Sequence, residues 1–232
     1  MSLNKEVFKT RALTALVFVL VMLFGIFING YTFALLFSII MFGCLFEFAK
    51  IIKIIKPKGY RAFLIFALPY IIVPLIMFIS LGINLDNDKI NFKAFNNIVP
   101  VAILFSIWLN DTMQYLVGSF FGKTPFSKIS PKKTWEGTIG GAILCVFVMG
   151  LFGYFVPAFN KLALQHWLTI AAICAVFGTL GDLLESKLKR LAGLKDSGTF
   201  MPGHGGFLDR FDSLLVAAPF VWLYVQVFVV KY

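Results

Sequence analysis

Long apolar runs recur from one end of the chain to the other, and they constrain its fold more than any other feature. Of the 232 residues, 59% are hydrophobic and only 14% are charged, whereas an ordinary globular protein carries about a quarter of its residues as charged side chains. An apolar run of roughly 20 residues is long enough to cross a bilayer as a helix. The pattern therefore predicts an all-α, polytopic integral membrane helix bundle and excludes a soluble domain.

The runs predict about seven transmembrane helices in a single integral membrane domain that comprises the whole chain. The expected spans are residues 12–28, 31–49, 62–83, 98–109, 137–156, 167–180 and 214–230. The third span contains Pro69 and Pro74 and is expected to be kinked. A tight turn is expected at Asn29-Gly30, and residues 84–97 are polar and are expected to form a loop.

Residues 110–121 remain apolar but are interrupted by Asn110 and Asp111. They form a helix extension, a re-entrant segment or a separate short span. A separate span would raise the count from seven to eight, and the apolar content of the chain admits a count of up to nine. We therefore distinguish N-terminal spans at about 12–109 from a catalytic part at about 110–232, which carries the polar segments.

Basic residues are distributed unequally between the two sides of the predicted bundle. The chain has 21 Lys and Arg against 11 Asp and Glu. On the layout above, all basic residues lie on the side of the N-terminus except Lys89, Lys93, Lys161 and Lys231. Because basic loops stay in the cytoplasm, this side is predicted to be cytoplasmic and the protein to lie in the cell (inner) membrane. An eighth span would break this alternation, so the charge distribution favours seven.

The positive charge suits anionic lipid headgroups and phosphate-bearing ligands. Nucleic acid is excluded as a partner, because the chain has no soluble basic face. The cysteines lie singly in apolar runs, so we expect them to pack in the core and to form neither a zinc site nor a disulfide.

Acidic residues are scarce, and most of them fall in or beside two polar cytoplasmic segments, residues 110–136 and 182–212. They are Asp111, Glu136, Asp182, Glu185, Asp196, Asp209 and Asp212. A carboxylate at the end of a membrane span indicates a functional site, and the alternative is a solvated loop. If the helix continues beyond residue 180, Asp182 and Glu185 share one face with Ser186 and Lys189.

The two segments also contain many Lys, Arg and Gly residues. Carboxylate oxygens favour Mg²⁺, which usually binds one or two carboxylates together with substrate phosphates. Basic side chains neutralise phosphate oxygens, and glycines let backbone N–H groups approach an anion. The composition thus predicts a metal-dependent phosphate-transfer site at the membrane surface. Gly137, Gly140 and Gly141 are expected to permit close helix packing.

Two stretches in the C-terminal half have a specific residue spacing. One is Ser186-x-Leu188-Lys189-Arg190, then Lys195-Asp196-x-Gly198, then Pro202-x-His204-Gly205-Gly206-Phe207-x-Asp209-Arg210-Phe211-Asp212. The other is Ser130-Pro131-Lys132-Lys133-Thr134-Trp135-Glu136-Gly137 with Gly140-Gly141. Together they resemble the signatures of phosphatidate cytidylyltransferases (CDP-diacylglycerol synthases). Gln114 and Ser119 depart from the small and basic residues expected there, and Met201 is a conservative change.

The resemblance implies transfer of the cytidylyl group of CTP to phosphatidic acid, which gives CDP-diacylglycerol and pyrophosphate for phospholipid synthesis on the cytoplasmic face. It also implies Mg²⁺, with two cations in the site. The implied metal ligands or their close supports are Asp182, Asp209 and Asp212, with Asp111 as a further member. The implied catalytic residues are these first three aspartates with Lys189, Arg190 and His204. The implied substrate-binding residues are Ser130, Lys132, Lys133, Ser186, Lys195 and Arg210.

The expected partners are CTP, phosphatidic acid and membrane lipids, and a homodimer is compatible with a membrane enzyme of this size. A CTP-dependent lipid kinase is the main alternative, because a related site could deliver the γ-phosphate and release CDP. A membrane transporter is a weaker alternative, since the chain lacks the internal symmetry that such folds have. The sequence pattern of CDP-alcohol phosphatidyltransferases is absent.

Overall fold

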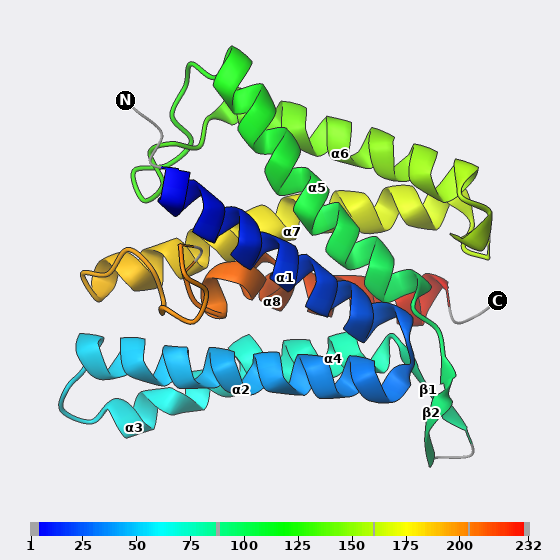
Figure 1. The fold of residues 1–232 in the computed structure, drawn as a ribbon, viewed down its shortest axis with the longest axis horizontal. Helices are drawn as coiled ribbons and strands as arrows, with labels where there is room; N and C mark the ends of the chain where they lie inside the picture. The colour runs from blue at the N-terminus through cyan, green and yellow to red at the C-terminus, as the bar shows by residue number, and fades with distance from the viewer. Residues whose placement is uncertain (1–4, 87–88, 160, 204, 230–232) are drawn as a thin grey trace. The chain divides into compact units, whose positions relative to one another are not determined.

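The computed structural model describes residues 5–86, 89–159, 161–203 and 205–229, and helices dominate this part of the chain (Figure 1). The long helices are α1 (Lys5–Phe27), α2 (Gly30–Ile55), α5 (Ile98–Phe121), α6 (Trp135–Phe155), α7 (Leu164–Leu191) and α8 (Leu208–Phe228). A broken helical segment comprises α3 (Tyr60–Phe63), η1 (Leu64–Phe66), η2 (Leu68–Ile72) and α4 (Val73–Ser80), and η3 (Pro157–Phe159) is a short turn.

Each predicted span coincides with one long helix or with the broken segment, so the all-α, polytopic helix bundle is confirmed. Among the described residues, five segments are long and apolar enough to cross a membrane: residues 30–55, 60–80, 135–155, 164–191 and 208–228. The chain is therefore a multi-pass membrane protein. That seven helices cross the bilayer stays a prediction.

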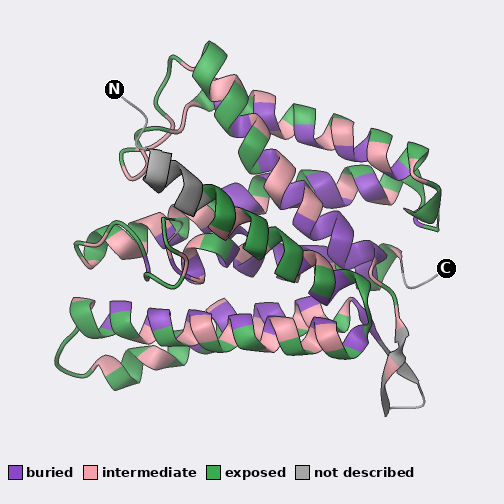
Figure 2. Ribbon diagram, in the orientation of Figure 1, coloured by how far each residue is buried: buried purple, intermediate pink, exposed green. Residues whose placement is uncertain are grey.

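Many large apolar side chains remain on the outside of the helices. Figure 2 shows α1 largely exposed from residue 12 onward, and Leu13, Leu16 and Phe24 are each more than half exposed. Exposed apolar surface of this extent would be unfavourable in water. It matches the lipid contact that the composition predicts.

The chain divides into two compact units, which we call unit 1 and unit 2. Unit 1 contains residues 1–97 and 188–211, and unit 2 contains residues 98–187 and 212–232. The helices α7 and α8 therefore each contribute residues to both units. The prediction of a single integral membrane domain stays a prediction, because two such units can belong to one domain.

In unit 1, α2 packs against α1, against the broken segment and against a small β-hairpin. Aromatic side chains fill the space between α2 and α4: the rings of Phe37 and Phe78 are 4.6 Å apart, and those of Phe33 and Phe78 are 5.6 Å apart. The turn predicted at residues 29 and 30 is confirmed, because Asn29 caps α2 by accepting the N–H of Thr32 at 2.9 Å. Such a cap satisfies a backbone donor that the helix leaves unpaired.

The third predicted span is an interrupted helix, with the interruptions beside the two prolines; the bend of its axis stays a prediction. Helical hydrogen bonding between residues 60 and 80 passes through a 3₁₀ turn and a π turn before α4 begins. Pro69 and Pro74 lie at the first or second positions of η2 and α4. Proline lacks an N–H group and crowds the preceding turn, so each proline interrupts the regular helix.

The prediction of a loop at residues 84–97 is wrong. The segment forms an antiparallel hairpin of β1 (Ile83–Asp86) and β2 (Lys89–Phe95). The reason is the alternation of Lys89, Ile90, Asn91, Phe92 and Lys93 between polar and apolar residues, which is typical of a strand. The high content of polar residues concealed this alternation.

In unit 2, α5 and α6 lie along each other (Figure 1). Helix α5 runs without interruption to Phe121, so residues 110–121 are an extension of the preceding helix rather than a separate span. A Cβ atom on Gly137 would come within 2.8 Å of the Cα atom of Gly118, and one on Gly141 would collide with the backbone of Gln114. The close packing predicted for these glycines is confirmed.

Candidate active site

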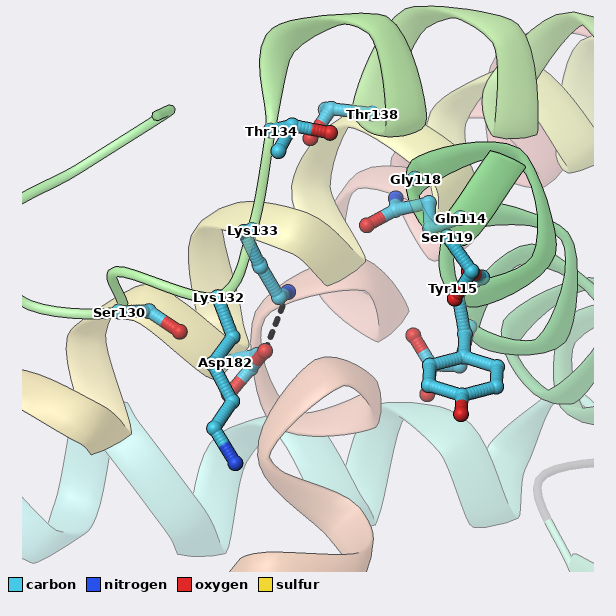
Figure 3. Close-up of a pocket in the computed structure, with 11 residues that line it drawn as sticks. Gln114, Tyr115, Gly118, Ser119, Ser130, Lys132, Lys133, Thr134, Thr138 and Asp182 are labelled. Atoms are coloured by element: carbon cyan, nitrogen blue, oxygen red, sulfur yellow. Dashed lines mark hydrogen bonds and ion pairs between the residues drawn. The ribbon is translucent and has the colours of Figure 1, made fainter. Parts of the chain in front are cut away.

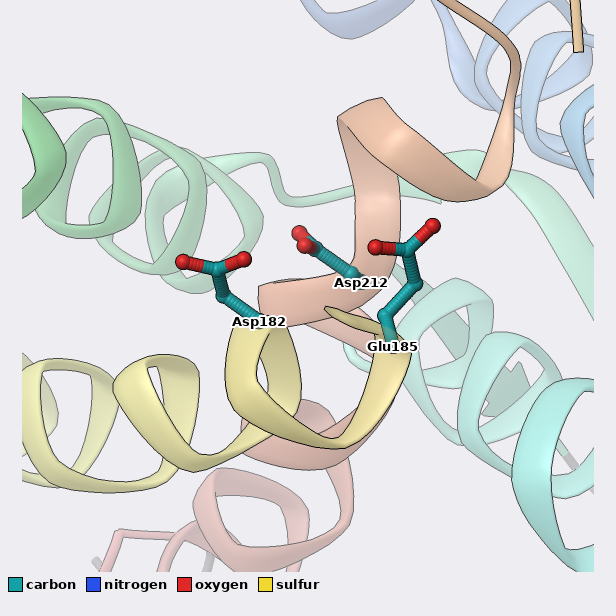
Figure 4. A group of neighbouring side chains, drawn as sticks. All are labelled: Asp182, Glu185 and Asp212. Carbon is teal, nitrogen blue, oxygen red and sulfur yellow. The ribbon is translucent and has the colours of Figure 1, made fainter. Parts of the chain in front are cut away.

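Three carboxylates converge where α7 and α8 pack together in unit 2. Asp182 and Glu185 lie one turn apart on α7, and Asp212 lies in the first turns of α8. One oxygen from each carboxylate lies within 4.8 Å of the others, and the three groups point to the same side of the two helices (Figure 4). Glu185 is fully buried, and Asp212 is 8% exposed.

Small residues bring the two helices close enough for this convergence. A Cβ atom on Gly181 would collide with the carbonyl oxygen of Asp212, so only glycine fits at this point of α7. The hydroxyl of Ser213 donates to the carbonyl oxygen of Gly178 at 3.0 Å, and the N–H of Ser213 donates to Asp212 Oδ1 at 2.6 Å. These contacts fix the Asp212 carboxylate beside α7.

The donor set fits a divalent cation. Carboxylates that are buried and close together repel each other and lose hydration, so they stay ionised only when a positive charge lies nearby. Oxygen ligands of this kind favour Mg²⁺ over softer metals. Asp182, Glu185 and Asp212 are therefore the group in the described residues that suits the predicted metal.

A pocket of about 520 Å³ opens beside Asp182 in unit 2 (Figure 3). Lys133 forms an ion pair with Asp182, and the hydroxyl of Ser186 donates to Asp182 Oδ1 at 3.3 Å. The lining residues are Asp111, Gln114, Tyr115, Gly118, Ser119, Ser130, Lys132, Lys133, Thr134, Thr138 and Asp182. The pocket thus combines lysines, hydroxyl groups and carboxylates, which is a lining suited to phosphate groups.

Hydrogen bonds at the start of α6 hold the lysine-bearing loop of this pocket in place. Thr134 caps α6 by accepting the N–H of Gly137 at 3.1 Å. Glu136 accepts the backbone N–H groups of Lys123 and Thr124, each at 3.1 Å, and the hydroxyl of Thr124 at 2.8 Å. Because both ends of the loop are tied to the helix, the lysines near residue 133 are carried on a fixed backbone.

In unit 1, Asp209 organises the loop between α7 and α8. Its Oδ1 accepts from Lys189 Nζ at 2.6 Å. Its Oδ2 lies 2.8 Å from the backbone N of Ser197, 2.9 Å from the Ser197 hydroxyl and 2.7 Å from the backbone N of Gly206. Asp209 therefore supports the loop in this structure, and its prediction as a direct metal ligand stays a prediction.

A second pocket of about 440 Å³ lies along the same loop. It is lined by Lys195, Asp196, Gly198, Thr199, Met201, Pro202, Gly203, Gly205 and Arg210. Gly203 and Gly205 adopt φ angles of 77° and 85°, which other residues rarely adopt. Two cationic side chains on a glycine-rich backbone make this pocket suitable for an anion.

The structure places the predicted site residues in two groups. Unit 2 holds Asp111, Ser130, Lys132, Lys133, Asp182, Ser186 and Asp212, and unit 1 holds Lys189, Arg190, Lys195, Asp209 and Arg210. Arg190 donates to the carbonyl oxygen of Leu194 at 3.0 Å and is a lining residue of neither pocket described above. His204 lies outside the described residues.

Two acidic residues have contacts that the sequence predictions did not assign. Glu185 was expected to share a helix face with Asp182 but was not among the implied metal ligands, and it completes the carboxylate group of unit 2. Glu47 contacts the loop of unit 1 through three hydrogen bonds. A lone ionisable residue within an apolar run was the available signal for Glu47.

Comparison with known proteins identifies the family of this chain. Residues 66–228 match the model of the cytidylyltransferase family. A phosphatidate cytidylyltransferase of Thermotoga maritima is 37% identical over 140 residues, which are 59% of this chain and 52% of that protein. The enzyme of the same name from Staphylococcus saprophyticus is 46% identical over 121 residues, which are 50% of this chain and 46% of the relative.

The phosphatidate cytidylyltransferase of Bacillus subtilis is 42% identical over 123 residues, which are 53% of this chain and 45% of the relative. The chain thus spans about half the length of these relatives. The matched residues 66–228 include both pockets and the three converging carboxylates. This chain belongs to the cytidylyltransferase family.

Proposed function

We propose that this protein transfers the cytidylyl group of CTP to phosphatidic acid and releases CDP-diacylglycerol and pyrophosphate. The observation that carries the proposal is the group of three carboxylates beside a lysine-lined pocket in unit 2. The relatives named phosphatidate cytidylyltransferase support the choice of substrates.

In the proposed reaction, an oxygen of the phosphatidate phosphate attacks the α-phosphorus of CTP. A new P–O bond forms, and the bond from the α-phosphorus to the oxygen that bridges it to the β-phosphorus breaks, so pyrophosphate leaves with that electron pair. The attacking phosphate is already ionised near neutral pH, so the step needs no strong general base. Positioning and charge neutralisation supply the catalysis.

Asp182, Glu185 and Asp212 would hold Mg²⁺. Asp111 lines the same pocket of unit 2 as Asp182 and would support the metal site. When bound, the cations neutralise phosphate charge at the reacting centre. Lys132 and Lys133, which line the pocket beside Asp182, would bind phosphate oxygens.

In unit 1, Lys195 and Arg210 would bind phosphate groups of the substrates. The ion pair between Lys189 and Asp209 would keep the loop in shape. We assign the remaining predicted residues, Ser130, Ser186, Arg190 and His204, to supporting contacts.

We further propose that the protein lies in the cell (inner) membrane with both polar segments on the cytoplasmic side. The bias of basic residues toward that side supports this orientation. CTP is available there, whereas phosphatidic acid arrives from the membrane itself. A homodimer is compatible with a membrane enzyme of 232 residues, and the proposed reaction does not require one.

The test uses purified protein in detergent with phosphatidic acid, CTP and Mg²⁺, and it follows pyrophosphate and the CDP-lipid together. We expect equal amounts of both products, with no turnover after removal of Mg²⁺. Asp182→Asn keeps the size of the side chain but removes its charge, and it should lower kcat/KM by about 100-fold or more. Lys161→Gln, in the loop between η3 and α7, is the matched control and should leave kcat/KM unchanged.

Other outcomes identify other activities. Release of CDP instead of pyrophosphate would indicate that the γ-phosphoryl group is transferred and would replace this proposal with a lipid kinase. No turnover of CTP with any lipid phosphate would contradict the enzymatic proposal as a whole.

A further inference from the structure

A buried glutamate on α2 holds the loop that connects α7 to α8. Glu47 lies inside the apolar helix α2 and is only 5% exposed. Its Oε1 accepts the N–H of Phe207 at 3.0 Å. Its Oε2 accepts the N–H of Leu208 at 2.9 Å and the hydroxyl of Ser197 at 2.7 Å. Both oxygens are thus used, and all three donors belong to the same loop and the start of the next helix.

The hydrogen bonds explain how a carboxylate can be buried at this position. An ionisable group in an apolar helix is costly unless it is hydrogen-bonded. Two of the donors are backbone N–H groups at the N-terminal end of α8, where a helix leaves donors unpaired and its dipole favours negative charge. Glu47 therefore caps α8, although it lies 161 residues before Leu208 in the sequence.

The surface of α2 is also shaped to receive this loop. A Cβ atom on Gly43, one turn before Glu47, would collide with the ring of Phe207. Cβ atoms on Gly198 and Gly206 would collide with the Glu47 carboxylate. The absence of side chains at these three positions lets the loop backbone approach the carboxylate closely.

The contact continues from Glu47 to the predicted site residues through Ser197. The Ser197 hydroxyl lies 2.7 Å from Glu47 Oε2 and 2.9 Å from Asp209 Oδ2. Asp209 in turn accepts from Lys189 Nζ at 2.6 Å. Gly198, next to Ser197, lines the pocket that contains Lys195 and Arg210. A displacement of Glu47 would therefore disturb the pocket backbone.

We propose that Glu47 is a positioning residue, which fixes the loop at Ser197, Phe207 and Leu208 so that its pocket can bind the phosphate groups of CTP. Glu47 does not contact the substrate itself. The proposal rests on the proposed function for the identity of the ligand, but the anchoring by Glu47 can be tested without it.

Glutamine cannot replace this carboxylate. A carboxylate accepts hydrogen bonds at both oxygens, whereas an amide has one acceptor and one donor group. In Glu47→Gln, the NH₂ group of the amide would replace one of the two carboxylate oxygens. It would then face either the N–H of Phe207 or the N–H of Leu208. One backbone donor would then lose its partner, while the volume of the side chain stays nearly the same.

The first readout is amide hydrogen exchange of the full-length protein in detergent. We expect Glu47→Gln to speed exchange about tenfold or more at residues 206–208, with little change in α5 and α6. Phe46→Leu is the matched control, because Phe46 neighbours Glu47 on α2 but is 63% exposed. If residues 206–208 exchange at the wild-type rate in Glu47→Gln, the proposal that Glu47 anchors the loop is overturned.

The second readout separates positioning from a loss of folded protein. Glu47→Gln should raise KM for CTP about tenfold or more and change kcat less, whereas partial unfolding would lower kcat at constant KM. Glu47→Asp keeps an acceptor-only group and should restore part of the affinity. Ser197→Ala should also raise KM for CTP. In the double variant with Glu47→Gln, the loss of binding free energy should be smaller than the sum of the losses in the two single variants, because both residues belong to one hydrogen-bond network.

The two proposals fail in different ways. If the wild-type protein makes no CDP-lipid, the proposed function fails, and the exchange measurement still decides whether Glu47 anchors the loop. If the wild type is active and Glu47→Gln loosens the loop without raising KM for CTP, Glu47 is only structural and the positioning role is overturned.

Discussion

Glu185 and Asp209 carry the same charge, but their surroundings predict different responses to neutralisation. Glu185 is fully buried beside Asp182 and Asp212, whereas the Asp209 carboxylate already accepts from Lys189, Ser197 and Gly206. Glu185→Gln should weaken binding of Mn²⁺, used as a probe for Mg²⁺, by about tenfold or more. Asp209→Asn should change Mn²⁺ affinity little and should lower activity through the loop.

Electron paramagnetic resonance of the full-length protein, titrated with Mn²⁺ in detergent, measures these affinities directly. Equal losses of affinity in Glu185→Gln and Asp209→Asn would show that Asp209 is a metal ligand as well, which is one of the two roles that the family resemblance implies for it. Unchanged affinity in Glu185→Gln would remove Glu185 from the metal site.

At the scale of the helices, two glycines of α7 face α8 and differ in the space around them. A Cβ atom on Gly181 would collide with the carbonyl oxygen of Asp212, whereas one on Gly178 would lie 3.4 Å from the Cβ atom of Ser213, an ordinary contact. Gly181→Ala should therefore destabilise the protein by about 1–3 kcal/mol and weaken Mn²⁺ binding, because it moves Asp212. Gly178→Ala should be neutral or stabilising, since alanine favours the helix by about 1 kcal/mol.

Thermal unfolding in detergent compares these two variants with the wild type. A similar midpoint for Gly181→Ala and the wild type would mean that α8 can move away from α7 without loss. In that case, the convergence of the three carboxylates would not depend on the close approach of the two helices.

The helices themselves were predictable because apolar runs of sufficient length have few alternatives in a membrane. Their ends were less predictable: α7 continues to Leu191, beyond the predicted end at residue 180. Polar residues that follow an apolar span do not by themselves interrupt the backbone hydrogen bonds of a helix. The hairpin at residues 83–95 was missed because its alternation is short. The lone acidic residue Glu47 in an apolar run was a visible signal, but its hydrogen-bond partners could not be predicted, since they lie about 150 residues away and share no local pattern with it.

For the whole molecule, the bias of basic residues predicts which segments share a side of the membrane. Residues 128 and 195 should face the cytoplasm, and residue 161 the opposite side. The native cysteines Cys44, Cys145 and Cys174 are each 0% exposed, so the background of thiol labelling should be low. Single substitutions Lys128→Cys, Lys195→Cys and Lys161→Cys then introduce accessible thiols at three exposed positions.

A membrane-impermeant maleimide should label Lys161→Cys in intact spheroplasts and should label Lys128→Cys and Lys195→Cys only in inverted vesicles. This pattern requires an odd number of crossings between residues 128 and 161 and between residues 161 and 195, which α6 and α7 supply. Because neutral cysteine replaces one lysine at a time, most of the charge bias that sets the orientation remains. Labelling of Lys128→Cys and Lys195→Cys from opposite sides would contradict the seven-span topology, and labelling of both in spheroplasts would reverse the proposed orientation of the active site.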